Sequence, residues 1–149
     1  HNVVAILGDV HTYSPDKLYD ALVLYDIGGA ERALPVVREL SRAKTFLLLN
    51  RETPQGEADL RELSEALKNA GIPFTYEPFE QEHVQPFRSR EDAKSYFLFS
   101  TNRMLTDEEL DAMLTQSDDE AFPCAFVEKR KLGMLVFDAA NPALKKPII

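Results

Sequence analysis

The amino-acid sequence predicts an α/β fold with a mostly parallel sheet and helices on both of its faces. Two observations predict this class. Short apolar runs recur through the first half of the chain, and amphipathic helical repeats follow two of them. The resulting order is β, β, α, β, α, β, which is typical of doubly wound sheets with right-handed crossovers.

Two strands are predicted near the start of the chain, and each ends in an acidic residue. Residues 3–7 form an apolar run that Gly8 and Asp9 end, and residues 21–25 form a second run that Asp26 ends. Open α/β sheets bind ligands at the carboxyl ends of their strands. Asp9 and Asp26 are therefore candidate site residues.

The next segments continue the alternation of helix and strand. Apolar residues at helical spacing predict a helix over 30–40, and a third buried strand follows over 45–50. A second amphipathic helix is predicted over 60–70, where Gly71 ends it. Residues 74–79 alternate like a fourth strand with one more exposed face.

Two capping boxes mark the later part of the chain. Ser89-x-x-Asp92 and Thr106-x-x-Glu109 each predict the start of a short helix. We expect these helices to form an insertion at about 86–118. Within it, Tyr96, Phe97 and Phe99 fall at helical spacing, which favours an aromatic core stripe over a substrate pocket.

The C-terminal part predicts a hairpin and a tail. Residues 122–127 and 132–137 read as antiparallel strands around a charged, solvated turn at 128–131. We expect residues 1–138 to form a single α/β domain. The tail over 139–149 ends in the apolar Ile148 and Ile149, which would need a neighbour to cover them.

Composition excludes several classes of function. The chain has 17 basic and 25 acidic side chains and a net charge of -8, which opposes binding to nucleic acid. Its single cysteine, Cys124, excludes a disulfide framework and fits a reducing, cytoplasmic compartment, where it is expected to be a small buried residue. No apolar run is long enough to span a bilayer, and the first residues lack the order of a signal peptide, so a soluble protein is expected.

Several segments carry a resemblance to a known family. They are Gly8-Asp9, residues 19–23, 38–42 and 45–50, Leu67-Lys-Asn-Ala-Gly-Ile-Pro73, residues 85–93, and Lys131-Leu-Gly-Met-Leu-Val-Phe137. In order and spacing they resemble the later half of the class I S-adenosylmethionine-dependent methyltransferases. The resemblance implies a Rossmann-like sheet, S-adenosylmethionine as cofactor, and methyl transfer to a small acceptor, for which it identifies no catalytic residue.

The resemblance also implies roles for particular residues. Asp9 would accept a hydrogen bond from the adenine amine, and Val10 would offer its backbone amide. Tyr25 and Asp26 would lie beside the methionine portion of the cofactor. The acceptor would be recognised in the insertion by the group Phe87, Arg88 and Tyr96.

The resemblance places the family's glycine-rich cofactor loop upstream of these residues. The sequence starts at His1 without a methionine and enters a strand at once, which predicts a fragment with an open sheet edge. A second copy or an upstream domain would cover that edge. In a competing register, residues 22–29 form the first strand and glycine loop, and Glu52 is the ribose acid.

Two other functions remain open. A noncatalytic α/β module could serve association through its open edge. Gly8-Asp9-Val-His11 also resembles the first metal motif of calcineurin-like metallophosphoesterases, but His1, His11 and His83 are too few to complete a dinuclear centre. No metal site is therefore predicted, and His11 is expected to be a solvated loop residue.

Overall fold

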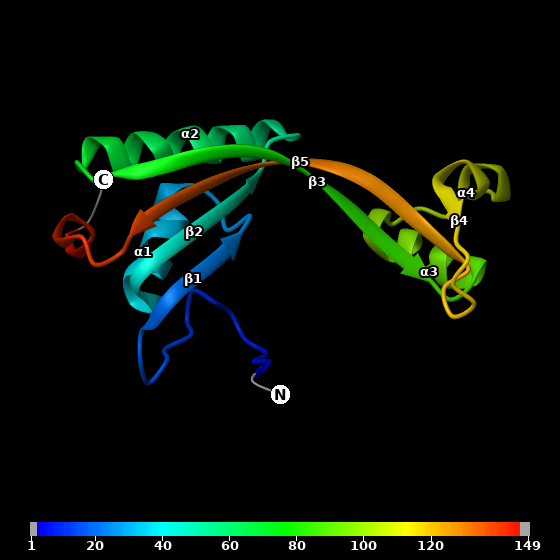
Figure 1. Cartoon of the computed structure of the whole chain (residues 1–149), viewed down its shortest axis with the longest axis horizontal. Coiled ribbons are helices and arrows are strands. Elements are labelled where there is room, and N and C mark those ends of the chain that lie inside the picture. Colours follow the sequence, from blue (N-terminus) through cyan, green and yellow to red (C-terminus); the bar gives the residue numbers. More distant parts are fainter. Residues whose placement is uncertain (1–2, 147–149) are drawn as a thin grey trace. The chain divides into compact units, whose positions relative to one another are not determined.

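The structure is a computed structural model that describes residues 3–146. The chain divides into two compact units (Figure 1). Of the described residues, the first unit contains 3–79 and 131–146, and the second contains 80–130. The second unit is therefore longer on both sides than the insertion predicted at 86–118.

The elements follow one another as β1 (Tyr19–Tyr25), α1 (Ala30–Leu40), β2 (Ser41–Asn50), α2 (Pro54–Asn69), β3 (Phe74–Phe87), α3 (Arg90–Thr101), α4 (Asp107–Met113), β4 (Leu114–Gln116), β5 (Cys124–Asp138) and η1 (Pro142–Lys145). The long strands β3 and β5 begin in one unit and end in the other. The sheet order is β1-β2-β5-β3, and β4 pairs with β5.

The predicted α/β class is confirmed, but the sheet is largely antiparallel. β1 pairs with β2 in parallel, whereas β2 and β4 pair with β5 in antiparallel fashion. Figure 1 also shows β3 and β5 running in opposite directions. The cause is the position of β5, which returns between β2 and β3 and separates two strands that would otherwise be parallel neighbours.

The predicted C-terminal hairpin is wrong, because residues 124–138 form the single strand β5. The charged run lies inside this strand and alternates between exposed and half-buried positions. Glu128 and Arg130 occupy the same side of the strand and form an ion pair with an N–O distance of 2.5 Å. Because the two half-buried charges pair with each other, they can lie within an extended strand and do not require a solvent-exposed turn.

The strand predicted over 3–7 is also absent. These residues have no strand conformation, and Val3, Val4 and Leu7 are 88%, 83% and 104% exposed. An apolar strand of an α/β sheet requires neighbouring strands and a covering helix. Within residues 3–146, no strand pairs with this segment and its apolar side chains stay exposed.

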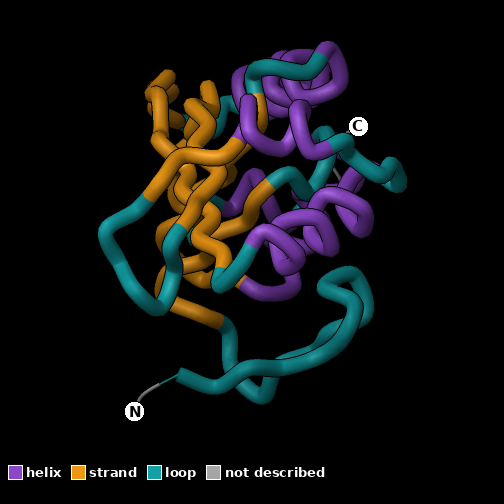
Figure 2. The backbone as a smooth tube through the Cα atoms, turned by 90° about the vertical axis from the view of Figure 1, so that its right-hand side faces the viewer, coloured by secondary structure: helices purple, strands orange, loops and turns teal. Residues whose placement is uncertain are grey.

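One face of the sheet in the first unit carries the core; we call it the helical face. The strand residues on this face, aligned by the β1–β2–β5 register, are Leu22, Leu24, Thr45, Leu47, Leu49, Leu135 and Phe137. They pack with buried residues of both α1 and α2. Figure 2 colours the helices purple and the strands orange. The expectation of helices on both faces is therefore not met in this unit.

The opposite face, which we call the open face, is apolar and partly exposed. The register aligns Val23 with Phe46 and Val136, and Tyr25 with Leu48 and Met134. Val23 is 64% exposed and Tyr25 is 48% exposed. Antiparallel sheets can leave one face in solvent, but that face is then usually polar. This face therefore has the composition of a buried surface without the cover of one.

The second unit has a separate aromatic core. Phe87, Phe97 and Cys124 are buried in it, and the rings of Phe97 and Phe126 lie 5.3 Å apart. Buried Cys124 confirms its expected role as a small core residue. Phe99, in contrast, is 92% exposed, so the predicted aromatic stripe does not include it.

Both predicted capping boxes begin helices. The Ser89 side chain accepts from the Asp92 amide at the start of α3, and the Thr106 and Glu109 side chains cap α4 reciprocally. In the tail, η1 places Leu144 in the first unit's core at 1% exposure. Ile148 and Ile149 lie outside the described residues. Within residues 3–146, no helix is long and apolar enough to cross a bilayer.

Candidate ligand site at the carboxyl ends of β1 and β2

The carboxyl ends of the parallel strands β1 and β2 are joined by Asp26. Its backbone amide donates to the Leu48 carbonyl at 2.8 Å, which is a normal ladder bond. Its φ is then +48°, so the backbone turns away from β2. The Asp26 carboxylate instead accepts the next amide, that of Asn50, at 2.8 Å. Asp26 therefore ends β1 and extends its pairing by one hydrogen bond.

The loop after β2 is equally constrained. The Asn50 side chain accepts from the Glu52 amide at 2.8 Å, and Thr53 caps α2 by accepting from Gly56 at 3.0 Å. A Cβ at Gly56 would lie 1.7 Å from the Asn50 carbonyl oxygen. Glycine is therefore required here, because α2 begins in direct contact with the end of β2. Glu52, the ribose acid of the competing register, is exposed.

A carboxylate from α2 already occupies the amino end of α1. Helix amino ends near the carboxyl ends of strands are the usual anion sites of α/β sheets. Here Glu62 accepts from the Ala30 amide at 2.9 Å and from the Glu31 amide at 3.4 Å. Gly29, the N-cap residue, has no side chain that could cap the helix. The Glu62 carboxylate of α2 caps α1 instead.

The segment that carries Asp9 and Val10 is a loop rather than a strand end. The Asp9 carboxylate accepts from the His11 amide at 2.9 Å, and its carbonyl accepts from the amides of Thr12 and Tyr13. Val10 is half-buried and packs against the first unit's core. A cavity of about 150 Å³ adjoins both residues. It is smaller than the roughly 300–1,000 Å³ of typical small-molecule sites.

The remaining predicted site residues lie on β1 and in the second unit. Tyr25 is half-exposed on the open face of the sheet. Phe87 is 2% exposed, and its ring packs 5.3 Å from that of Tyr96. Arg88 is exposed, and its amide donates to the Asp92 carboxylate at 3.1 Å. Of the three proposed acceptor-binding side chains, Arg88 is thus the most accessible.

These residues do not by themselves fit S-adenosylmethionine. Asp9 is engaged within its own turn, Asp26 bonds the Asn50 amide, and Glu62 fills the amino end of α1. The carboxyl ends of β1 and β2 could contact a ligand from one side only, because within residues 3–146 no strand lies along the outer edge of β1.

Sequence reasoning missed Glu62 and the close approach at Gly56. Glu62 reads as one of many exposed helix acids, and its partner amides are 31 and 32 residues away in sequence. Thr53-Pro54 did carry a signal, since a capping residue followed by proline is typical of a helix start. That signal places the beginning of α2 before the apolar repeat begins.

Comparison with protein families and with curated proteins finds no match. Within residues 3–146 there is also no group of three or more His, Cys, Asp or Glu side chains placed to hold a metal ion.

Proposed function

We propose that this chain is the C-terminal part of an S-adenosylmethionine-dependent methyltransferase that acts on a small acceptor. The observation that carries the proposal is the strand order β1-β2-β5-β3 with β5 reversed. The later half of class I methyltransferase sheets ends in the same way, with a last strand that runs antiparallel and inserts one place inside the edge. The resemblance in sequence assigns β1 and β2 to the fourth and fifth strands of such a sheet.

The placement of the helices supports the same reading. Both α1 and α2 pack on the helical face while the chain moves from β1 toward β3. With right-handed crossovers, strands added beyond β1 would carry their helices on the opposite face. That is the open face, with its exposed Val23 and Tyr25. The mostly parallel, doubly covered sheet predicted from the sequence would then belong to the longer protein.

In such a sheet the winding direction changes at the free edge of β1. Ligands of doubly wound sheets bind at this switch point, beyond the carboxyl ends of the strands. Tyr25 and Asp26 would form one wall, and an upstream strand with its glycine-rich loop would form the other. S-adenosylmethionine would supply an electrophilic methyl group there, while the protein's contribution is chiefly alignment of the acceptor.

Calorimetric titration with S-adenosylhomocysteine tests this proposal. We expect no heat of binding from the 149-residue chain, and saturable binding from a protein extended upstream through a strand and a glycine-rich loop. In the extended protein, Asp9→Asn should weaken binding, whereas Asp16→Asn, in the same loop, should not. Absence of binding by the extended protein would refute the methyltransferase assignment.

A second candidate function is noncatalytic association through the open face and the free edge of β1. The observation that favours it is the exposure of apolar side chains on β1, whose outer edge pairs with no strand of the described residues. Sedimentation velocity should then show concentration-dependent dimers that Val23→Lys abolishes and Val127→Lys, on β5 in the second unit, leaves intact. A chain that stays monomeric at all concentrations would argue against self-association.

A further inference from the structure

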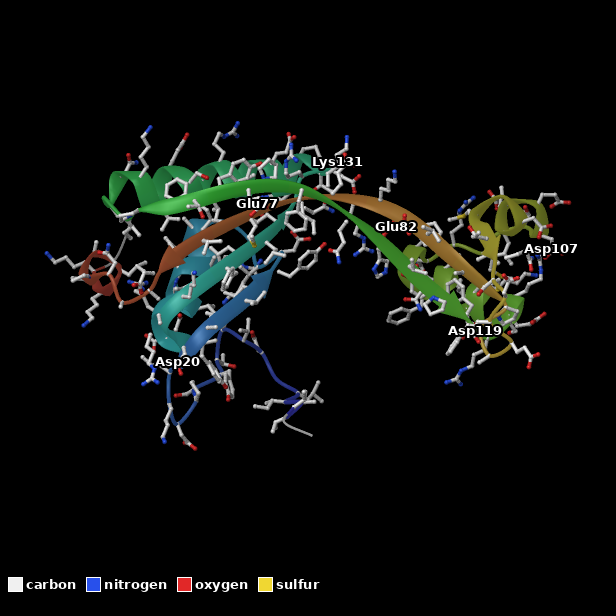
Figure 3. All side chains as sticks on the ribbon, in the orientation of Figure 1. Asp20, Glu77, Glu82, Asp107, Asp119 and Lys131 are labelled. Atoms are coloured by element: carbon white, nitrogen blue, oxygen red, sulfur yellow. The ribbon has the colours of Figure 1, made fainter. Side chains whose placement is uncertain are left out.

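A larger cavity lies in the first unit, at the amino ends of β1 and β2. It has a volume of about 610 Å³, within the range of small-molecule sites. Its walls come from the last turn of α1, the start of β2 and the segment that follows β5. Asp20, labelled in Figure 3, marks this end of β1. The cavity is therefore separate from the candidate site at the carboxyl ends of the same strands.

The charge of this cavity is opposite to that of the chain. The protein has a net charge of -8, yet the ionic side chains lining the cavity are three cations, Arg38, Arg42 and Lys145, and one carboxylate, Glu39. Within residues 3–146, neither Arg38 nor Lys145 forms an ion pair. An excess of cations around a concave surface attracts and concentrates anions.

Arg42 is held in place by a carboxylate outside the cavity lining. Its Nε lies 2.6 Å from Asp20 Oδ1. This hydrogen bond raises the pKa of Arg42 and lowers that of Asp20, so both groups remain charged over the physiological range. The contact occupies Nε and leaves the two terminal nitrogens of the guanidinium group for another acceptor.

The rest of the lining is largely apolar. Leu144 is 1% exposed and Leu18 is 43% exposed, and Ala139 and Ala140 complete this part of the wall. Ser41 adds a hydroxyl group, which accepts from Thr45 at 3.0 Å. The lining therefore combines three cations and one carboxylate with several apolar side chains.

We propose that this cavity binds a small organic phosphate monoester, with its phosphate at Arg38, Arg42 and Lys145 and its apolar body against Leu18 and Leu144. Guanidinium groups match phosphate oxygens bidentately, and three cations suit a dianion better than a single carboxylate. The assignment is independent of the methyltransferase proposal, because no residue is shared between the two sites.

The test is an NMR titration of the ¹⁵N-labelled 149-residue chain with phenyl phosphate. We expect saturable shifts clustered at the amides of Leu18, Ser41 and Leu144. Inorganic phosphate, which lacks the apolar body, should bind at least tenfold more weakly. Binding of the protein to vesicles that contain phosphatidic acid is measured in parallel. If the protein binds these vesicles but its amide signals do not respond to phenyl phosphate, the proposal of a small-molecule site is overturned.

Two variants separate binding from structure. Arg38→Gln and Lys145→Gln should each weaken phenyl phosphate binding about tenfold, as expected for loss of one charged contact at about 1.4 kcal/mol per tenfold. Arg61→Gln, on the exposed surface of α2, should leave binding unchanged. Arg38 also lies in the last turn of α1, where a cation stabilises the helix end. If both variants retain parental binding, these cations are structural and the proposal is overturned.

Discussion

At the scale of single residues, the end of β1 is held by a side chain where the backbone can no longer pair. Asp26 adopts a left-handed conformation that aspartate tolerates better than most residues, and its carboxylate takes the Asn50 amide. The end of the strand at Asp26 was predictable, because the apolar run over 21–25 stops there. The partner of the Asp26 carboxylate was not predictable, since 24 residues separate the two groups.

Asp26→Ala is expected to lower the free energy of unfolding by about 1–2 kcal/mol. The substitution removes a charge-assisted hydrogen bond, and alanine tolerates a positive φ less well than aspartate does. Asp26→Asn should lose less than half as much, since asparagine tolerates this φ and keeps an acceptor. Urea denaturation monitored by circular dichroism measures both. Asp16→Ala, in an exposed loop, is the control. Equal losses in the two Asp26 variants would contradict this role.

At the scale of elements, α1 and α2 are linked through one contact that local sequence patterns do not reveal. Both helices were predictable from their apolar spacing, and both form. The contact between them was not, because Glu62 reaches the amides of Ala30 and Glu31 only when the tertiary fold has formed. Gly29 permits the approach, since a Cβ there would lie 2.4 Å from Glu62 Oε2.

Gly29→Ala and Glu62→Ala should therefore be non-additive. Each single substitution is expected to cost about 1 kcal/mol, because each removes the same cap from α1. The double variant should be no less stable than Glu62→Ala alone. Urea denaturation of the four proteins in the cycle gives the coupling energy, with Glu65→Ala as a control on α2. Additive losses would show that Gly29 does not act through Glu62.

The helices of the second unit are joined by ion pairs. Asp107, at the start of α4, lies 2.6 Å from Lys94 Nζ and also pairs with Arg90, while Arg90 contacts Asp111. The hydrogen bond from Lys94 lowers the pKa of Asp107, and the Thr106 amide and Arg103 lower that of Glu109. The capping-box sequence predicted the helix start but gave no indication of these cross-helix pairs.

These lowered pKa values predict acid sensitivity of the second unit. A carboxyl group whose folded pKa is depressed stabilises the fold above its unfolded pKa, and the contribution is lost as pH falls through the folded value. The second unit should therefore lose stability below about pH 4. Two-dimensional NMR of amides in α3 and α4 between pH 7 and 2.5 measures this loss. Asp107→Asn should flatten the profile, whereas Glu108→Gln should not; identical profiles would contradict the prediction.

At the scale of the whole molecule, the sequence predicted most of the extended segments but not how the strands are ordered. The charged residues at the centre of β5 read as a turn, so the sequence did not predict a single strand. The strands that pair with β5, β2 and β3, lie far away in sequence and are not visible in the local pattern. The segment over 3–7 shows the reverse. Its composition is that of a buried strand, but no strand of the described chain pairs with it.

The free edge of β1 is the feature on which the proposed function depends. Asp26 donates its amide toward β2, so by strand alternation the Leu24 amide also points toward β2, while those of Val23 and Tyr25 point toward the free edge. An additional strand in a longer protein would bond these two amides. Their exchange with solvent therefore reports directly whether the edge is open or paired.

Amide hydrogen exchange of β1 is the most direct test of this interpretation. In the 149-residue chain, we predict slow exchange at Leu24 and fast exchange at Val23 and Tyr25. In a protein extended upstream that binds S-adenosylhomocysteine, the Val23 and Tyr25 amides should become as protected as that of Leu24. Protection of all three in the short chain, or continued fast exchange at Val23 and Tyr25 in the extended protein, would contradict it.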